Sequence, residues 1–433
     1  MCRKMNIGLL KSREVKNAGW IIFEQVFQML ISLIVSILSA RYLGPGNFGS
    51  LNYTASFVTF ALSVATLGME GVVIKKLVAA PGAEGQYLGS CMLYRIVASI
   101  LSMIAVTAVV FILNPGDGEK VVLVLLQSFQ LLFRAVQILD CWFQRHLKSR
   151  YTSIGKLAAC LCVSAYKIFL LVTHRSIIWF AFSNALSDLV IALVLVVFYL
   201  KENTQKLEVR PGLGREVLAE SYHFILSGLM TAIYSQMDKI MLGQILTDTD
   251  VGYYTTATSI CGMWIFVPVA LINSFRPKIL ELKQRGDEKQ YLLRLKQLYS
   301  VVIWLSIGVS LVITFLGKWI VLVLYGEAYL GAVSALRIAI WFETFAMIGT
   351  ARGIWILCEG RNRYVKYYLG IGALVNLVLN TLWIPVWGIE GAAFATLITQ
   401  IVTSLIAPLL FRETRVHTRI VLDAFLLAWR KEK

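Results

Sequence analysis

YLGSCMLYRIVASILSMIAVTAVVFIL, residues 87–113, holds one charged side chain, Arg95, in a run otherwise made of apolar and small polar residues. A helix crosses the roughly 30 Å hydrocarbon core of a bilayer with about 20 consecutive, mainly apolar residues. The run is long enough for this. It is also too continuous for a barrel strand, in which apolar and polar positions alternate over about ten residues. We therefore expect residues 87–113 to form a transmembrane helix.

Similar apolar runs recur along the whole chain. Together with residues 87–113 they predict about twelve transmembrane helices, the others near residues 18–41, 48–70, 119–140, 152–173, 177–200, 222–246, 251–275, 298–316, 330–350, 364–386 and 390–411. The composition agrees, because only 15% of the 433 residues are charged, against roughly 25% in soluble proteins. We predict an all-α polytopic membrane protein with no room for a soluble domain.

The distribution of the net charge of +16 along the chain distinguishes a membrane protein from a nucleic-acid-binding protein. Lys and Arg concentrate in alternate loops, and the intervening loops hold only Arg41, Lys120, Arg175 and Lys318. This is the positive-inside pattern, which predicts a multi-pass protein of the bacterial cytoplasmic (inner) membrane with both termini cytoplasmic. A nucleic-acid partner is not expected, because the charge is spread over many loops rather than gathered on one face.

The chain divides into two halves at residues 201–221, a basic stretch with six expected spans on each side. Arg210–Gly214 carries Pro and two Gly residues and is expected to break the helix there. We predict two lobes of six helices each, residues 1–210 and 211–433. A short echo in the outer turns, residues 43–49 and 246–252, places Leu and Gly in matching register and suggests parallel repeats.

Polar side chains form stripes at helical spacing inside several expected spans, and a helix surrounded by lipid would not carry them. Four such stripes predict a continuous polar cavity. Small Ser and Thr residues could instead serve helix packing, which leaves the longer side chains as the stronger candidates. The candidate cavity residues are Glu24, Gln28, Arg95, Gln130, Arg134, Lys167, Tyr234, Asp238 and Arg337.

Two explanations exist for the charged members of this set. Asp188 or Asp238 could neutralise Arg134 or Lys167 as a buried ion pair. Alternatively, the basic residues could favour an anionic substrate, because a low dielectric strengthens each attraction. Glu24 and Asp238 are the candidates for ion coupling, with H+ or Na+ as the ion. We expect no metal centre and no cofactor, since no metal-ligand cluster or nucleotide fingerprint occurs.

Several motifs resemble polysaccharide-unit (Wzx-like) flippases of the multidrug/oligosaccharidyl-lipid/polysaccharide exporter superfamily. They cover nearly the whole chain, and their order carries more weight than any one of them. They are Ala40-Arg41-Tyr42-Leu43-Gly44-Pro45 with Phe48-Gly49, Asp140 with Trp142-Phe143-Gln144, Lys148 and Tyr151, Tyr234 with Asp238-Lys239-Ile240-Met241-Leu242-Gly243, Val251-Gly252-Tyr253-Tyr254 with Ala257, Leu324-Tyr325-Gly326 with Tyr329, and Gly388-Ile389-Glu390-Gly391-Ala392-Ala393.

The resemblance implies two six-helix lobes around a central cavity that opens alternately to each side of the membrane. It implies flipping of undecaprenyl-diphosphate-linked oligosaccharide repeat units to the outer leaflet, for O-antigen, capsule or exopolysaccharide biosynthesis. The implied partners are the lipid-linked oligosaccharide, membrane lipid, and polysaccharide polymerase and chain-length machinery. The protein would be a transporter and not an enzyme.

Two other functions remain open from the sequence. A drug or metabolite antiporter of the same superfamily would share the lobes, but the basic residues within the spans argue against a cationic cargo. A membrane polysaccharide polymerase or ligase would usually need a sizeable external loop, and the expected external loops are short.

Overall fold

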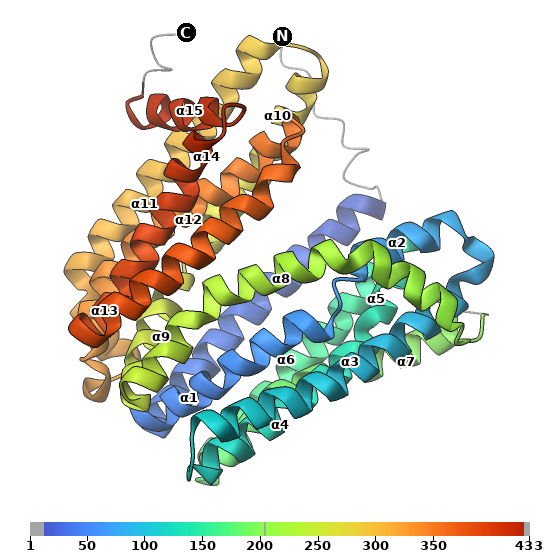
Figure 1. Ribbon diagram of the computed structural model, residues 1–433, viewed down its shortest axis with the longest axis horizontal. Helices are drawn as coiled ribbons and strands as arrows, with labels where there is room; N and C mark the ends of the chain where they lie inside the picture. Colours follow the sequence, from blue (N-terminus) through green and yellow to red (C-terminus); the bar gives the residue numbers. More distant parts are fainter. Residues whose placement is uncertain (1–12, 203–204, 428–433) are drawn as a thin grey trace. The chain divides into compact units, whose positions relative to one another are not determined.

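The computed structural model describes the backbone of residues 13–202 and 205–427, with side chains from residue 28 onward within these ranges (Figure 1). The regular secondary structure in these ranges is helical. The chain forms two compact units. Unit 1 comprises the described residues up to Tyr42 together with Thr54–Leu229, and unit 2 comprises Leu43–Tyr53 with the described residues from Met230 onward.

Unit 1 is a helical bundle, and its chain passes back and forth through short turns. Its elements are most of α1 (Arg13–Ala65), α2 (Glu70–Ala79), the 3-10 turn Pro81–Ala83, α3 (Glu84–Leu113), α4 (Gly118–Val136), the 3-10 turn Gln137–Leu139, α5 (Asp140–Arg145), α6 (Ser149–Val172), α7 (Ile177–Glu202) and the first half of α8 (Pro211–Ile245). α4 packs against both α3 and α7, and α6 packs against α7.

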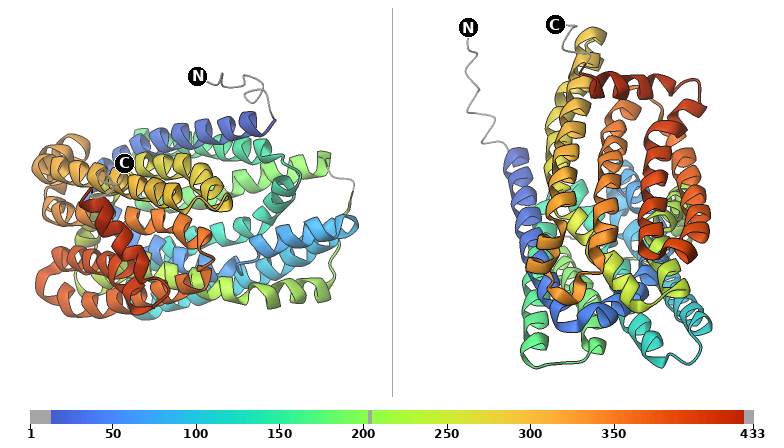
Figure 2. Two further views of the ribbon diagram at one scale, coloured as in Figure 1. Left: turned by 90° about the horizontal axis from the view of Figure 1, so that it is seen from above. Right: turned by 90° about the vertical axis from the view of Figure 1, so that its left-hand side faces the viewer.

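Unit 2 is a second bundle, in which α12 packs against α9, α11 and α13. Its elements are the rest of α8, α9 (Asp248–Gly262), α10 (Phe266–Gln284), α11 (Glu288–Leu324), the 3-10 turn Glu327–Tyr329, α12 (Ala332–Cys358), the 3-10 turn Asn362–Tyr364, α13 (Val365–Ile401), a π-helical turn Val402–Ile406, α14 (Ala407–Leu410) and α15 (Arg415–Phe425). The short helix α15 lies across one end of the long helices of this unit (Figure 2).

The expected membrane helices are present. Within the described ranges, 9 continuous helical runs are long and apolar enough to cross a membrane. The first and last of these, 52 and 49 residues long, each cover two expected spans. The expected span at residues 222–246 lies in α8, which is not among the 9 runs. Counted in this way, every expected span coincides with a helix, and the all-α polytopic class is confirmed.

Glycine divides each of the two longest runs. Gly44 has a φ of 71° inside α1, directly before Pro45, and Gly388 has a φ of 59° inside α13. Both angles lie in the left-handed region, which costs a side-chain-bearing residue energy and costs glycine none. The two glycines therefore let the chain turn back between consecutive spans without a longer loop.

The expected helix break at Arg210–Gly214 is wrong in detail. α8 begins at Pro211, which suits the first position of a helix because its missing N–H would be unpaired there anyway. The segment before it is fastened to α3, since the Ser90 hydroxyl donates to the Arg210 carbonyl (2.9 Å) and accepts from its N–H (2.8 Å). The lobe boundary after residue 210 stays a prediction. In the structure, α8 up to Leu229 groups with unit 1.

The two turns with matching Leu and Gly residues, residues 43–49 and 246–252, pack directly on each other within unit 2. A Cβ atom on Gly49 would lie 1.6 Å from the Asp248 carbonyl oxygen, and one on Gly252 would lie 2.1 Å from that of Pro45. The second turn starts α9 with a capping box between Thr247 and Asp250. The glycines of this echo are therefore required for close backbone contact.

Candidate substrate and coupling sites

The first polar site lies inside unit 1, around Arg134. Nη1 of Arg134 lies 3.1 Å from Oδ1 of Asp188 on α7. Gln137 joins the pair, because its Nε2 donates to the same Asp188 oxygen at 2.8 Å and its Oε1 accepts from Arg134 at 3.0 Å. Of the two explanations for Arg134, the structure therefore shows the ion pair: the carboxylate of Asp188, in the same bundle, compensates the charge of Arg134.

A cavity of about 190 Å³ adjoins this pair. Its lining residues are mainly polar or charged: Glu70, Arg134, Gln137, Asp140, Cys141, Gln144, Thr152, Lys156, Ile191 and Leu195. A cavity of this size with many polar partners can hold ordered water. Asp140, from one of the sequence motifs, is occupied by local contacts, since it accepts from Gln144 and from Thr152.

Arg95 lies near this cavity and is buried with little compensation of its charge. Its side chain is 1% exposed, and its nearest acidic group is Glu70, 3.8 Å from Nη1. None of its three guanidinium nitrogens has a hydrogen-bond partner in the part of the chain that the structure describes. The long separation makes the Glu70 contact a weak ion pair, so the Arg95 charge is only partly compensated.

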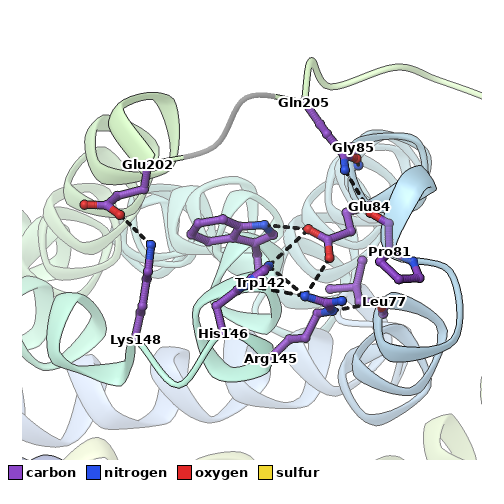
Figure 3. A network of polar contacts seen from close by, with 10 residues as sticks. All are labelled: Leu77, Pro81, Glu84, Gly85, Trp142, Arg145, His146, Lys148, Glu202 and Gln205. Carbon is purple, nitrogen blue, oxygen red and sulfur yellow. Dashed lines mark hydrogen bonds and ion pairs between the residues drawn. The ribbon is translucent and has the colours of Figure 1, made fainter.

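A second group of unit 1 residues holds the ends of several helices together. Glu84, 5% exposed, accepts from Trp142 Nε1 at 2.8 Å, lies 2.9 Å from Arg145 Nη1 and lies 3.2 Å from His146 Nε2 (Figure 3). Arg145 also donates to the Leu77 carbonyl at 2.8 Å. These contacts fix α5 against α2 and α3, which gives the Trp142 motif a structural role.

The main polar site of unit 2 surrounds Asp238 on α8, which is 5% exposed. Four side chains donate to its carboxylate. Tyr254 and Thr396 contact Oδ2, each at 2.6 Å, while Asn376 and Asn380 contact Oδ1 at 3.0 and 2.6 Å. Asn376 and Asn380 are four residues apart on α13, so they share one helix face.

The side chains around Asp238 bring several oxygen-bearing groups together in the buried interior of unit 2. It combines a carboxylate, two amide side chains and two hydroxyl groups, which are the ligand types that hard cations prefer. The Asn380 side-chain oxygen is buried and has no hydrogen-bond partner among the described residues. The neighbouring Lys239 interacts electrostatically with Asp238. The four donors thus satisfy the buried Asp238 carboxylate from α9 and α13.

The other predicted residues are distributed between the two units. Gln28, Gln130 and Lys167 lie in unit 1 and are partly exposed, and Gln130 donates to the Gln127 carbonyl at 3.1 Å. Tyr234, partly exposed, and Arg337, exposed, lie in unit 2. Glu24 falls outside the residues whose side chains the structure describes. Arg134 and Arg95 lie on the packed helices α4 and α3 of unit 1 and interact electrostatically. Tyr234 lies one turn before Asp238 on α8 and interacts with its charge.

Sequence analysis missed the partners of Asp238 and also Arg352, which lies on α12 beyond the expected span end at residue 350. The sequence did contain a pattern that could have indicated two of these partners. Asn376 and Asn380 carry two amides at i and i+4 within an apolar run, which indicates a shared polar face. Tyr254 belongs to one of the family motifs, which gave it no role at Asp238. Thr396 gave no signal, because single hydroxyl groups are common in membrane helices.

Comparison with solved structures identifies the fold. The lipid II flippase MurJ in an inward closed conformation aligns over 94% of this chain and 91% of its own, with a TM-score of 0.74 and 15% identity. An inward-facing multidrug resistance MATE transporter of the MOP superfamily aligns over 94% of both chains, with a TM-score of 0.63 and 13% identity. The fold is that of these membrane transporters.

Sequence comparison gives the family. The chain belongs to the polysaccharide biosynthesis protein family, whose model matches residues 15–274, and the expected relationship to polysaccharide flippases is confirmed. It is 21% identical over 412 residues to the "Putative O-antigen transporter" of Escherichia coli strain K12, covering 93% of this chain and 97% of that protein. It is 28% identical over 191 residues to the "Probable flippase AglR" of Haloferax volcanii, covering 42% of this chain and 39% of that relative.

Proposed function

We propose that this protein flips undecaprenyl-diphosphate-linked oligosaccharide repeat units from the cytoplasmic to the outer leaflet of the bacterial inner membrane. The family assignment supports transport of polysaccharide precursors. The positive-inside charge pattern supports an orientation with both termini cytoplasmic. The flipped units would feed O-antigen, capsule or exopolysaccharide synthesis, with a polymerase and chain-length machinery acting downstream and no chemical step on this chain.

The observation that carries the mechanism is the buried carboxylate of Asp238 with its four donors. A charged group inside a membrane bundle is costly and usually functional. A cation that binds Asp238 must draw oxygen ligands from α8, α9 and α13, so binding would favour one arrangement of these helices over another. We infer that Na+ is the coupling ion, because the amide and hydroxyl groups that now donate to Asp238 also carry oxygen atoms that can turn towards a cation, whereas H+ needs only one acceptor.

Deletion of the gene tests the substrate. We expect lipid-linked repeat units to accumulate facing the cytoplasm and surface polysaccharide to disappear, with both restored by the wild-type gene. Normal surface polysaccharide in the deletion strain would reject this function. Loss of drug resistance with unchanged polysaccharide would favour the antiporter alternative, and unpolymerised units in the outer leaflet would favour the polymerase or ligase alternative.

Complementation by Asp238→Asn tests the coupling. We expect it to fail although the protein is present in the membrane at the wild-type level. Asp117→Asn is the matched control, because Asp117 caps α4 through a hydrogen bond from Lys120 N that Asn can also accept. In proteoliposomes, wild-type flipping should respond to a Na+ gradient. A response to a pH gradient alone would replace Na+ by H+.

A further inference from the structure

A pocket inside unit 2 contains an arginine, Arg352, whose charge has no carboxylate partner among the residues that the structure describes. The pocket has a volume of about 350 Å³ and lies between α8, α12, the start of α13 and the π-helical turn. It is lined by Tyr234, Ala346, Gly349, Thr350, Arg352, Val365, Tyr368, Leu369, Gln400, Thr403 and Ser404. Arg352 is the charged member of this lining, and no Asp or Glu is among these residues.

Arg352 is 9% exposed, and the contacts around it do not neutralise it. One guanidinium nitrogen donates to the Thr403 carbonyl, and the guanidinium carbon lies 4.5 Å from the centre of the Tyr368 ring. Its Nε atom is buried without a hydrogen-bond partner in the described chain. A buried cation held only by a carbonyl and an aromatic face retains a strong attraction for an anion.

The other polar groups of the pocket differ in what they can offer. The hydroxyl groups of Thr350 and Ser404 already donate to backbone carbonyls of Ala346 and Phe345, at 3.0 and 2.7 Å. Among the described residues, the Gln400 side chain makes no hydrogen bond, and only its backbone carbonyl accepts one, from Thr403. Its amide can therefore donate together with Arg352. The π-helical turn widens the backbone beside them, and such turns are frequent at functional sites.

We propose that the Arg352 pocket binds the diphosphate group of the lipid-linked substrate. An arginine fork suits phosphate oxygens, because two parallel N–H donors match two acceptor oxygens. Val365 and Leu369 provide an apolar wall for the first carbons of a prenyl chain. The pocket lies near the end of α12 that precedes Arg361 and Arg363, which is the expected cytoplasmic end, where the substrate would enter.

This inference rests on the proposed function for the identity of the ligand, and a binding measurement separates the two. Full-length protein purified in neutral detergent is titrated calorimetrically with geranyl diphosphate, and separately with geraniol, inorganic pyrophosphate and phosphatidylglycerol. We expect geranyl diphosphate to bind, inorganic pyrophosphate to bind more weakly, and geraniol and phosphatidylglycerol not to bind at comparable concentration.

Arg352→Gln should weaken geranyl diphosphate binding at least about tenfold, the effect of losing a charge-assisted hydrogen bond. Arg419→Gln is the matched control, because it removes one positive charge from an exposed position of the same unit and should leave binding unchanged. Unchanged affinity in folded Arg352→Gln, or equal binding of phosphatidylglycerol, would overturn the inference.

A second variant keeps the inference testable if Arg352→Gln does not fold. Gln400→Leu removes the other donor while keeping Arg352 and its contact with Thr403, and it should weaken geranyl diphosphate binding several-fold. Wild-type affinity in this variant would contradict the site. If binding depends on Arg352 while the deletion strain makes normal polysaccharide, the pocket stands as a diphosphate site and only the proposed flippase function fails.

Discussion

The guanidinium of Arg134 lies 3.1 Å from the carboxylate of Asp188, although 54 residues separate them in the chain. The Asp188 side chain is 11% exposed and the Arg134 side chain is 41% exposed. The Asp188 carboxylate is therefore the desolvated partner, and it depends more on the pair than the arginine does.

Removal of either partner should lower the stability of the protein. Because Arg134 is partly solvated, we expect only about 1–2 kcal/mol from Asp188→Asn or Arg134→Gln, seen as a lower Tm in detergent. The double variant should lose less than the sum of the two single variants, since each change already breaks the same pair. Additive losses would show that the two residues act independently.

Alanine at Gly49 should prevent correct folding of unit 2. Its Cβ atom would lie 1.6 Å from the Asp248 carbonyl oxygen, which is backbone and cannot move aside without breaking the turn. Gly46→Ala is the matched control, because its Cβ would meet only the Thr249 hydroxyl at 3.5 Å. We expect folded membrane protein by size-exclusion chromatography for Gly46→Ala and a large loss for Gly49→Ala. Equal yields would contradict the close packing of the two turns.

The buried His417 should make stability depend on pH. This residue of α15 lies 2.8 Å from the Tyr299 hydroxyl, and burial lowers the pKa of His417 well below its usual range. The folded state keeps the imidazole neutral, whereas the unfolded chain binds a proton near its ordinary pKa of about 6.5. The stability contributed by His417 is therefore complete above about pH 6.5 and falls by up to roughly 1.4 kcal/mol per pH unit below it.

Thermal unfolding between pH 8 and pH 5 measures this effect. His417→Gln should unfold at a lower Tm at pH 8 but with a shallower decline towards pH 5 than the wild type. His223→Gln changes an exposed histidine and should keep the wild-type slope. Identical slopes for the wild type and His417→Gln would reject the role assigned to His417.

The buried contacts of Glu84 with Trp142, Arg145 and His146 should contribute more to the stability of the protein than a nearby surface ion pair does. Glu84→Gln leaves Arg145, 17% exposed, without its carboxylate, and we expect a loss of about 3 kcal/mol. Glu202→Gln breaks the pair with Lys148, in which the two side chains are 30% and 36% exposed, and should cost clearly less than Glu84→Gln because water screens the pair. Comparison of the two Tm values tests the ranking, and a larger loss for Glu202→Gln would contradict it.

The C-terminal helix α15 is an element that the sequence patterns did not predict. His417 follows the last expected span, residues 390–411, but it lies in the helix α15 and is completely buried. The helix has only 11 residues, about half of what a membrane span needs, so a search for spans passes over it. Its buried face becomes apparent only when α11 lies beneath it, where the Ser300 hydroxyl donates to the Ala424 carbonyl at 2.6 Å.

The sequence alone determined the all-α membrane class. Apolar runs such as residues 87–113 are long enough to span a bilayer, and in lipid each such span must satisfy its own backbone hydrogen bonds as a helix. It also indicated that Asp238 matters, because a carboxylate within a membrane span is costly and usually functional. Tertiary structure alone decided the partners. Asn376, Asn380 and Thr396 lie 138 to 158 residues from Asp238, and only the packing of α13 against α8 and α9 brings their side chains to one carboxylate.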